Sequence, residues 1–91
     1  KAQVVKSDGF NTLSETFDVI LFNPPQTAGR KTCTRMIEDS LLHLHKKGSL
    51  LLVARHNKGG KTLSEFMETV FKNVECLGKQ GGYRVYRSFK K

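Results

Sequence analysis

A side-chain amide held between rigid residues is the feature of this sequence best suited to chemistry. Asn23 follows an apolar run at residues 19–22 and precedes Pro24 and Pro25. Proline fixes its own φ at about −65° and favours an extended conformation in the residue before it. The Asn23 amide and the Pro24 carbonyl can therefore point toward one place with little loss of entropy on binding. Two acceptor oxygens that converge in this way predict a receptor for an NH₂ group, which donates two hydrogen bonds.

The apolar run before Asn23 predicts the element that positions this amide. Residues 19–22 are continuously apolar, as in a parallel strand covered on both faces, and residues 49–55, rich in Leu and Val, predict a second such strand. Ligand sites in parallel sheets gather at the carboxyl ends of the strands. We therefore expect Asn23 and the loop of residues 55–61 to lie at the same edge of a sheet.

Basic side chains occupy both loops expected at this edge. Arg30 and Lys31 follow the proline turn, and Lys58 lies in the glycine-bearing loop of residues 55–61. Such side chains can hold RNA phosphates, although solvated charges beside a helix start would give the same pattern. The second loop is not a phosphate-binding P-loop, because its spacing and its ending differ. His56 in this loop is a conceivable general base, but a reaction of a bound amine depends mainly on aligning and desolvating the amine lone pair.

Periodicity predicts two helices and a closing hairpin around the strands. A first apolar stripe ends near Lys46 and Lys47, with Gly48 placed to terminate the helix. A capping box at residues 62–65 predicts the start of a second helix. Residues 73–78 and 83–89 read as short strands around the Gly81-Gly82 turn, and residues 2–6 as another strand. The members of the first helical stripe are Cys33, Ile37, Leu41 and Leu44.

Composition narrows the class of protein. The chain has 91 residues and a net charge of +8, which suits one small domain with a marginal core and a polyanionic partner such as RNA. Cys33 and Cys76 lack the spacing of a zinc site or a disulfide framework. No segment approaches the roughly 20 apolar residues that cross a bilayer, and no signal-peptide pattern begins the chain, so we expect a cytoplasmic protein without a membrane partner.

The order of these motifs resembles the class I S-adenosylmethionine (SAM)-dependent methyltransferases. A strand followed by Asn23-Pro24-Pro25-Gln26 looks like their fourth motif, and the closest likeness is to the small-subunit ribosomal RNA guanine-N2 methyltransferases and their compact relatives. The likeness extends from Ser7-Asp8-Gly9-Phe10 to the terminal hairpin. It implies an α/β fold class: the C-terminal half of a Rossmann-like sheet, with parallel strands, flanking helices and a terminal antiparallel hairpin. An unrelated α/β domain with a proline turn is the alternative.

The resemblance also implies roles for particular residues. Asn23, Pro24 and Pro25 match the catalytic motif, and no metal is implied. Near SAM it places four residues, namely Asp8, Gly9, Phe10 and Asn23. On the substrate side it implies Gln26, Arg30, Lys31 and Lys58. Without the resemblance, Asp8-Gly9 is a turn and Phe10 is a core residue.

Part of the family pattern is missing from these 91 residues. The glycine-rich turn that holds the methionine moiety of SAM is absent, and so is the acidic residue that holds the ribose. We therefore expect residues 1–91 to be the substrate-side half of a methyltransferase domain, truncated and inactive alone. The edge beside residues 17–22 would then be open and would favour self-association.

The implied activity is transfer of a methyl group from SAM to an exocyclic amine, with N2 of guanine in ribosomal RNA as the first candidate. Gln26 stands where relatives often carry an aromatic residue, so adenine or a protein glutamine stay open as targets. The alternative function is a non-catalytic RNA-binding or assembly module that keeps this half of the fold.

Overall fold

The computed structural model describes residues 2–5, 16–24 and 29–91, which form one five-stranded sheet and two helices. The strands lie in the order β1-β2-β3-β5-β4. β1, β2 and β3 are parallel, while β5 runs antiparallel to both β3 and β4. The parallel strands and the terminal antiparallel hairpin are therefore confirmed. The bounds of the elements are β1 Ala2–Val5, β2 Phe17–Phe22, α1 Arg30–Leu42, β3 Leu44–Arg55, α2 Gly60–Phe71, β4 Glu75–Gln80 and β5 Tyr83–Phe89.

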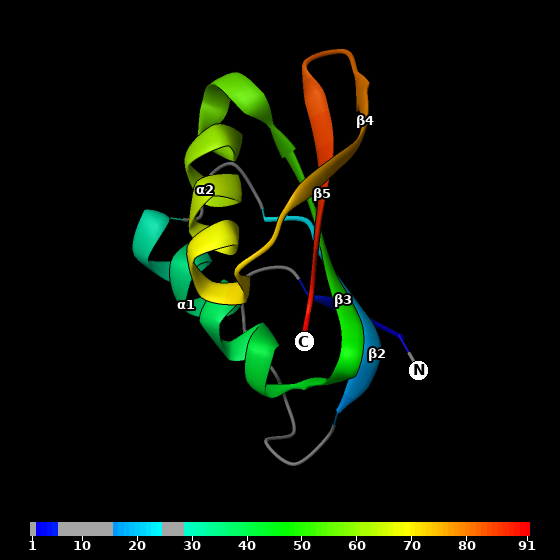
Figure 1. The fold of residues 1–91 in the computed structure, drawn as a ribbon. Coiled ribbons are helices and arrows are strands. Elements are labelled where there is room, and N and C mark those ends of the chain that lie inside the picture. Colours follow the sequence, from blue (N-terminus) through cyan, green and yellow to red (C-terminus); the bar gives the residue numbers. More distant parts are fainter. Residues whose placement is uncertain (1, 6–15, 25–28) are drawn as a thin grey trace.

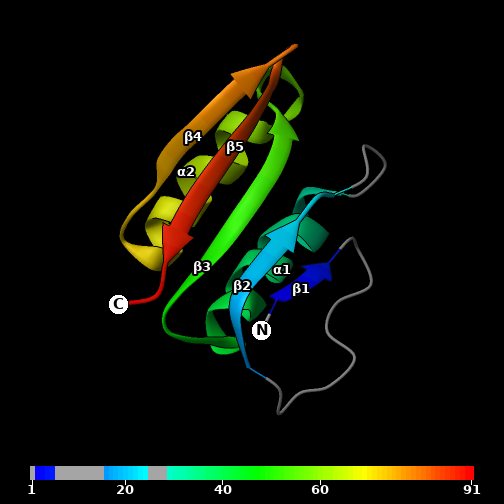
Figure 2. The same ribbon diagram turned by 90° about the vertical axis from the view of Figure 1, so that its right-hand side faces the viewer.

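Both helices pack on the same face of the sheet (Figures 1 and 2). The connections β2-α1-β3 and β3-α2-β4 run in the same direction along the sheet. Because crossovers between parallel strands are right-handed, two that run the same way place their helices on one side. The expectation that the parallel strands are covered on both faces is therefore wrong for the described residues. Val19, Leu21, Leu51 and Val53, which alternate with the buried residues, are only half-buried.

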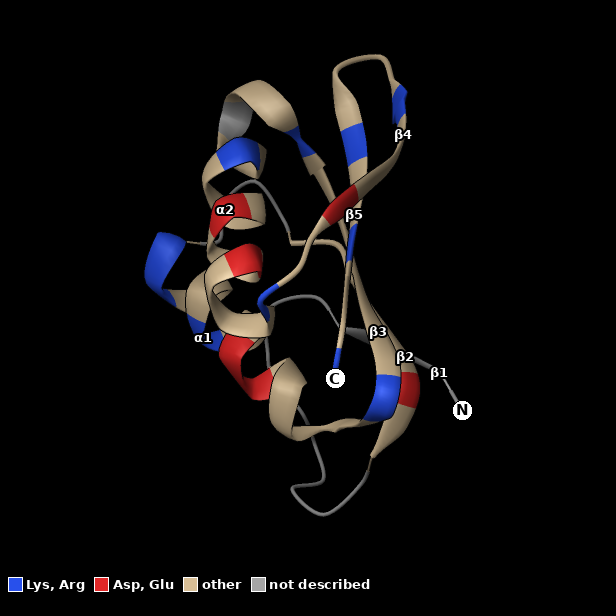
Figure 3. Ribbon diagram, in the orientation of Figure 1, with Lys and Arg blue, Asp and Glu red and all other residues tan. Residues whose placement is uncertain are grey.

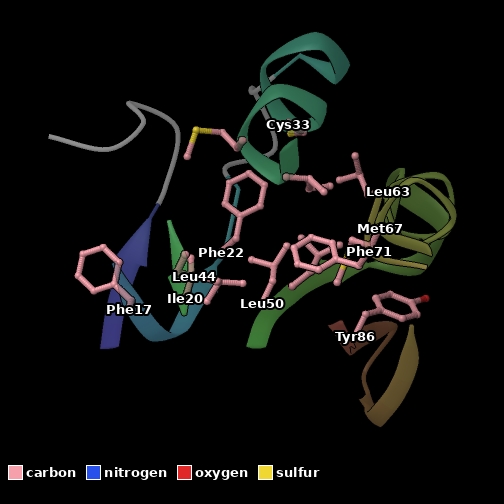
Figure 4. Close-up of a cluster of buried hydrophobic side chains, with 13 residues drawn as sticks. Phe17, Ile20, Phe22, Cys33, Leu44, Leu50, Leu63, Met67, Phe71 and Tyr86 are labelled. Atoms are coloured by element: carbon pink, nitrogen blue, oxygen red, sulfur yellow. The ribbon is translucent and has the colours of Figure 1, made fainter. Parts of the chain in front are cut away.

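The core lies between the sheet and the helices (Figure 4). Alternate residues of the central strands point toward it, and the buried stripe of α2 meets them there. The second helix that periodicity predicts is thereby confirmed. The strand residues are Ile20, Phe22, Leu50 and Leu52, and those of α2 are Leu63, Met67 and Phe71.

The first helix is shorter than the sequence predicts. The backbone N–H of His43 donates to the carbonyls of Asp39 and Ser40 and so caps α1 directly after Leu42. Leu44 instead begins β3, where it pairs with Phe17 and is 1% exposed. The local helix-end signals are overridden by this pairing between strands that lie far apart in the sequence.

The predicted helix-ending residues belong to β3. Lys47 has a φ of 68°, and its N–H donates to the carbonyl of Lys90 at 2.6 Å. Gly48 lies where a Cβ atom would be 2.9 Å from the carbonyl oxygens of both Asp18 and His45. Glycine at this position thus allows close approach of the backbones and does not terminate a helix.

α2 begins earlier than the predicted capping box. Its first residue is Gly60, preceded by Gly59 with a φ of 102°. Thr62 is an exposed residue within the helix, and the hydroxyl of Ser64 donates to the carbonyl of Lys61. The left-handed conformation of Gly59, a glycine-favoured geometry, starts the helix without a capping side chain.

A tight backbone approach at Gly60 gives a testable prediction. A Cβ atom at this position would lie 2.7 Å from the carbonyl oxygen of Arg55. We expect Gly60→Ala to lower the free energy of unfolding by about 1–3 kcal/mol, because the clash outweighs the usual benefit of alanine in a helix. Gly78→Ala is the matched control, since nothing lies within 4 Å of its Cβ position. Equal urea midpoints for the two variants would contradict the close approach.

The edge of β2 that the sequence predicts to be open is occupied in this structure. β1 pairs with β2 from Ala2↔Val19 to Val5↔Phe22. The expectation of self-association rested on an open edge of β2, and β1 covers that edge.

Candidate functional site

Asn23 stands directly beyond the carboxyl end of β2. Phe22, the last residue of the strand, is 1% exposed and anchors this end in the core. Asn23 itself is exposed, and within the described residues its amide forms no hydrogen bond. The chain thus changes from a buried core residue to an exposed amide within one peptide unit.

Pro24 follows as a half-buried residue, with its φ restricted by the ring. The other predicted positions of the motif and of the cofactor site are not covered. Pro25, Gln26, Asp8, Gly9 and Phe10 lie outside the described residues.

The predicted basic residues share the edge with Asn23. Arg30 and Lys31 form the first turn of α1 and are exposed. The backbone of Lys58 lies in a short 3₁₀ helix, His56–Lys58, directly after β3. Since β2 and β3 are parallel, both connections leave from the same end of the sheet.

The β4–β5 hairpin extends this edge. Phe22 pairs with Leu52, so β3 continues three residues farther, to Arg55, which pairs with Tyr83 at the start of β5. The Arg55 guanidinium lies over the Tyr83 ring, 5.6 Å from its centroid. The hairpin therefore brings basic and aromatic side chains beside the loop that follows β3.

His56 is held by contacts with the hairpin. Its Nδ1 lies 2.7 Å from the Tyr86 hydroxyl, its Nε2 lies 3.5 Å from Arg84, and its backbone N–H donates to Gly82. Desolvation by burial lowers the pKa of His56, and the positive charges of Arg84, Lys61 and Lys79 lower it further, against a smaller opposing effect of Glu65. The imidazole is thus kept neutral around neutral pH and is engaged with Tyr86. This arrangement gives no support to a role as general base at Asn23.

Lys61 belongs to the loop of residues 55–61 that the sequence places at this edge, whereas two further cations there, Lys79 and Arg84, were missed by sequence reasoning. Lys79 comes from β4 and Arg84 from β5, and the hairpin register places the two residues opposite each other. The available signal was the Gly81-Gly82 turn, both of whose residues have positive φ, because a tight turn sets the pairing of the residues on either side.

The described part of the chain contains neither a group of metal ligands nor a membrane-spanning helix. Among those residues, no three His, Cys, Asp or Glu side chains group together as metal ligands. No helix there is long and apolar enough to cross a membrane.

The sequence of the chain matches a known protein family. A model of the methyltransferase small domain matches residues 1–87. The chain belongs to this family. The match includes the strand that precedes Asn23, both helices and most of the terminal hairpin.

Curated relatives carry the same region within longer chains. The uncharacterised protein YbxB of Bacillus subtilis is 32% identical over 90 residues, which cover 97% of this chain and 45% of that protein. The ribosomal RNA small subunit methyltransferase C of Pseudoalteromonas atlantica is 36% identical over 90 residues, covering 94% of this chain and 25% of its own. The chain thus spans less than half the length of these relatives.

Solved structures share the fold. The T. thermophilus 16S rRNA N2 methyltransferase, in complex with AdoMet and guanosine, superposes with a TM-score of 0.77 at 20% identity over 84% of this chain and 20% of that chain. A methyltransferase from Pyrococcus furiosus gives a TM-score of 0.68 at 25% identity, covering 85% of this chain and 42% of its own. The expected α/β methyltransferase fold is therefore confirmed.

Proposed function

We propose that this chain is the amine-binding part of a SAM-dependent N-methyltransferase that acts on N2 of guanine in small-subunit ribosomal RNA. The observation that carries the proposal is the exposed Asn23 amide at the carboxyl end of β2, followed at once by Pro24. The names of the relatives support the reaction and the RNA substrate. Gln26 stands where relatives often carry an aromatic residue, so the choice between guanine and adenine is tested by experiment below.

Asn23 and Pro24 act by orienting the amine. The Asn23 side-chain oxygen accepts one N–H of the exocyclic amine, and the Pro24 carbonyl accepts the other. The amine is then fixed in a plane, and its lone pair points to one side. SAM, when bound, supplies the electrophilic methyl group to that side. Alignment of the two reactants is the main source of rate in such a step.

The described residues include a group suited to the amine but only one of the residues implied for the SAM pocket. Asn23 offers an exposed amide for an NH₂ group, whereas the other positions implied for SAM, Asp8, Gly9 and Phe10, lie outside the described residues. Residues 1–91 would accordingly supply the substrate side of a larger methyltransferase domain, acting in the cytoplasm, where its ribosomal RNA substrate is made in bacteria.

The test is methyl transfer by the whole protein encoded by the gene. With labelled SAM and small-subunit ribosomal RNA, followed by digestion to nucleosides, the label is expected in N2-methylguanosine. Label in a methylated adenine would overturn the choice of base. RNA binding without SAM binding in calorimetry would overturn the catalytic role and indicate a non-catalytic RNA-binding module.

A further inference from the structure

Three cations that form no ion pair within the described residues act on His56 beside the β4–β5 hairpin. We name Lys61, Lys79 and Arg84 the hairpin cation cluster. The Arg84 guanidinium lies 3.5 Å from the Nε2 of His56, and Lys61 and Lys79 are close enough to lower the pKa of the imidazole. Residues from three different elements thus place positive charge around one half-buried ring.

The cluster is not neutralised within the described residues. The ion pair that the structure shows there joins Arg87 to Glu75, and no member of the cluster forms one. Lys79 and Arg84 are directly paired across the antiparallel strands, and like charges in that position repel each other. Glu65 is the carboxylate that acts on His56 in the opposite sense. A bound anion would relieve this repulsion.

Acidic residues are distributed more unevenly along the molecule than basic ones (Figure 3). Lys and Arg lie at the edge beyond Asn23, in the starts of both helices, the end of β3 and the β4–β5 hairpin, and they also lie at the start of β3, after α2 and at the C-terminus. The described acidic residues lie in the body of α2, late in α1, and in β2 and β4. This edge therefore presents a positive surface beside the candidate amine site.

The strand register fixes how far the cluster lies from Asn23. Phe22 pairs with Leu52, so Asn23 is level with Val53, whereas Lys79, Arg84 and Ala54 lie one step farther along the sheet. Neighbouring strands are about 4.8 Å apart, so β5 is about 10 Å from β2 across the sheet. This separation suits one strand of nucleic acid that has a base at Asn23 and its neighbouring phosphates at the cluster.

We propose that the hairpin cation cluster binds backbone phosphates of the RNA strand that carries the target base. The inference rests on the proposed function for the identity of that strand. Lysine and arginine contacts to phosphate position a nucleic acid without reading its sequence. The cluster would therefore set the register in which the RNA crosses the edge, while Asn23 and Pro24 hold the amine.

The test compares two triple variants of the whole protein. One is Lys61→Gln, Lys79→Gln, Arg84→Gln, and the matched control is Lys46→Gln, Lys91→Gln, Arg35→Gln, which removes the same charge from exposed positions elsewhere. Affinity for a synthetic single-stranded RNA of mixed sequence is measured by fluorescence anisotropy over a range of salt concentrations. Equal thermal unfolding midpoints establish that each variant remains folded.

We expect the cluster variant to bind RNA roughly 10-fold or more weakly at low salt and its salt slope to fall by about 2, since each phosphate contact on a single strand contributes about 0.7. The control should stay within about 3-fold of the wild type, as expected for distant charges. Equal losses in both variants would overturn the inference, because net charge alone would explain them. Unchanged RNA affinity, with loss of binding to phosphatidylglycerol vesicles, would overturn it in favour of a membrane surface.

Failure of the proposed function gives a different result. If the wild-type protein transfers no methyl group but the cluster variant still loses RNA affinity, the phosphate site stands and the catalytic proposal falls. If transfer to guanine is observed and the two triple variants bind RNA alike, the catalytic proposal stands and the phosphate site falls.

Discussion

Asn23→Ala is expected to lower the rate of methyl transfer to RNA by about 10³-fold, because removing one positioned hydrogen-bonding group from a reacting centre typically costs 10²–10³ and misalignment adds to it. SAM affinity should remain nearly intact, since the amide is assigned to the amine. Single-turnover transfer of labelled methyl measures the first quantity, and calorimetry measures the second.

Asn57→Ala is the matched control for this substitution. Asn57 is also an exposed asparagine, in the 3₁₀ helix after β3, and its replacement should leave the rate within about 2-fold, as expected of a surface substitution. Unchanged turnover in Asn23→Ala would refute the role assigned to its amide. Loss of SAM affinity together with turnover would move Asn23 from the amine to the cofactor.

Leu50→Ala is expected to reduce the free energy of unfolding by about 2–5 kcal/mol, the range for removing a buried leucine side chain. Leu50 is 0% exposed and pairs with Ile20 at the centre of the sheet, where both strands face the helices. Relative to a total stability of about 5–15 kcal/mol for a domain, this is a large loss. Urea unfolding followed by circular dichroism measures it.

Leu42→Ala is the matched control, because it makes the same substitution at an exposed position. Leu42 is 73% exposed at the end of α1, so the same truncation should change stability by no more than about 0.5 kcal/mol. A similar loss in both variants would mean that Leu50 does not lie in the core.

The position of Asn23 directly after a buried strand was predictable because its determinants are local. An apolar run, an asparagine and two prolines are contiguous in the sequence, and each acts on the backbone of its neighbour. The same is true of the hairpin, whose Gly81-Gly82 turn is confirmed by the positive φ of both residues. Predictions of this kind require no knowledge of which strands pair.

The features that sequence reasoning missed depend on contacts between distant residues. α1 ends at Leu42 because Leu44 pairs with Phe17 and Lys47 bonds to Lys90, and neither partner is visible from the helix itself. The hairpin cation cluster likewise brings Lys61, at the start of α2, together with two residues of the β4–β5 hairpin that follow α2 in the sequence. The single covered face of the sheet follows from the direction of the crossovers, which the order of elements alone leaves undecided.

The insertion of β5 between β3 and β4 has a consequence for how the chain folds. Ser49 pairs with Phe89 and Arg55 with Tyr83, so the middle of the sheet joins segments separated by a whole helix and a strand. Contacts of such high contact order form slowly, because a long loop must close before any of them stabilises the chain. During synthesis the side of β3 that later meets β5 stays unpaired until Tyr83–Phe89 has emerged, which is the interval when this strand is most open to aggregation.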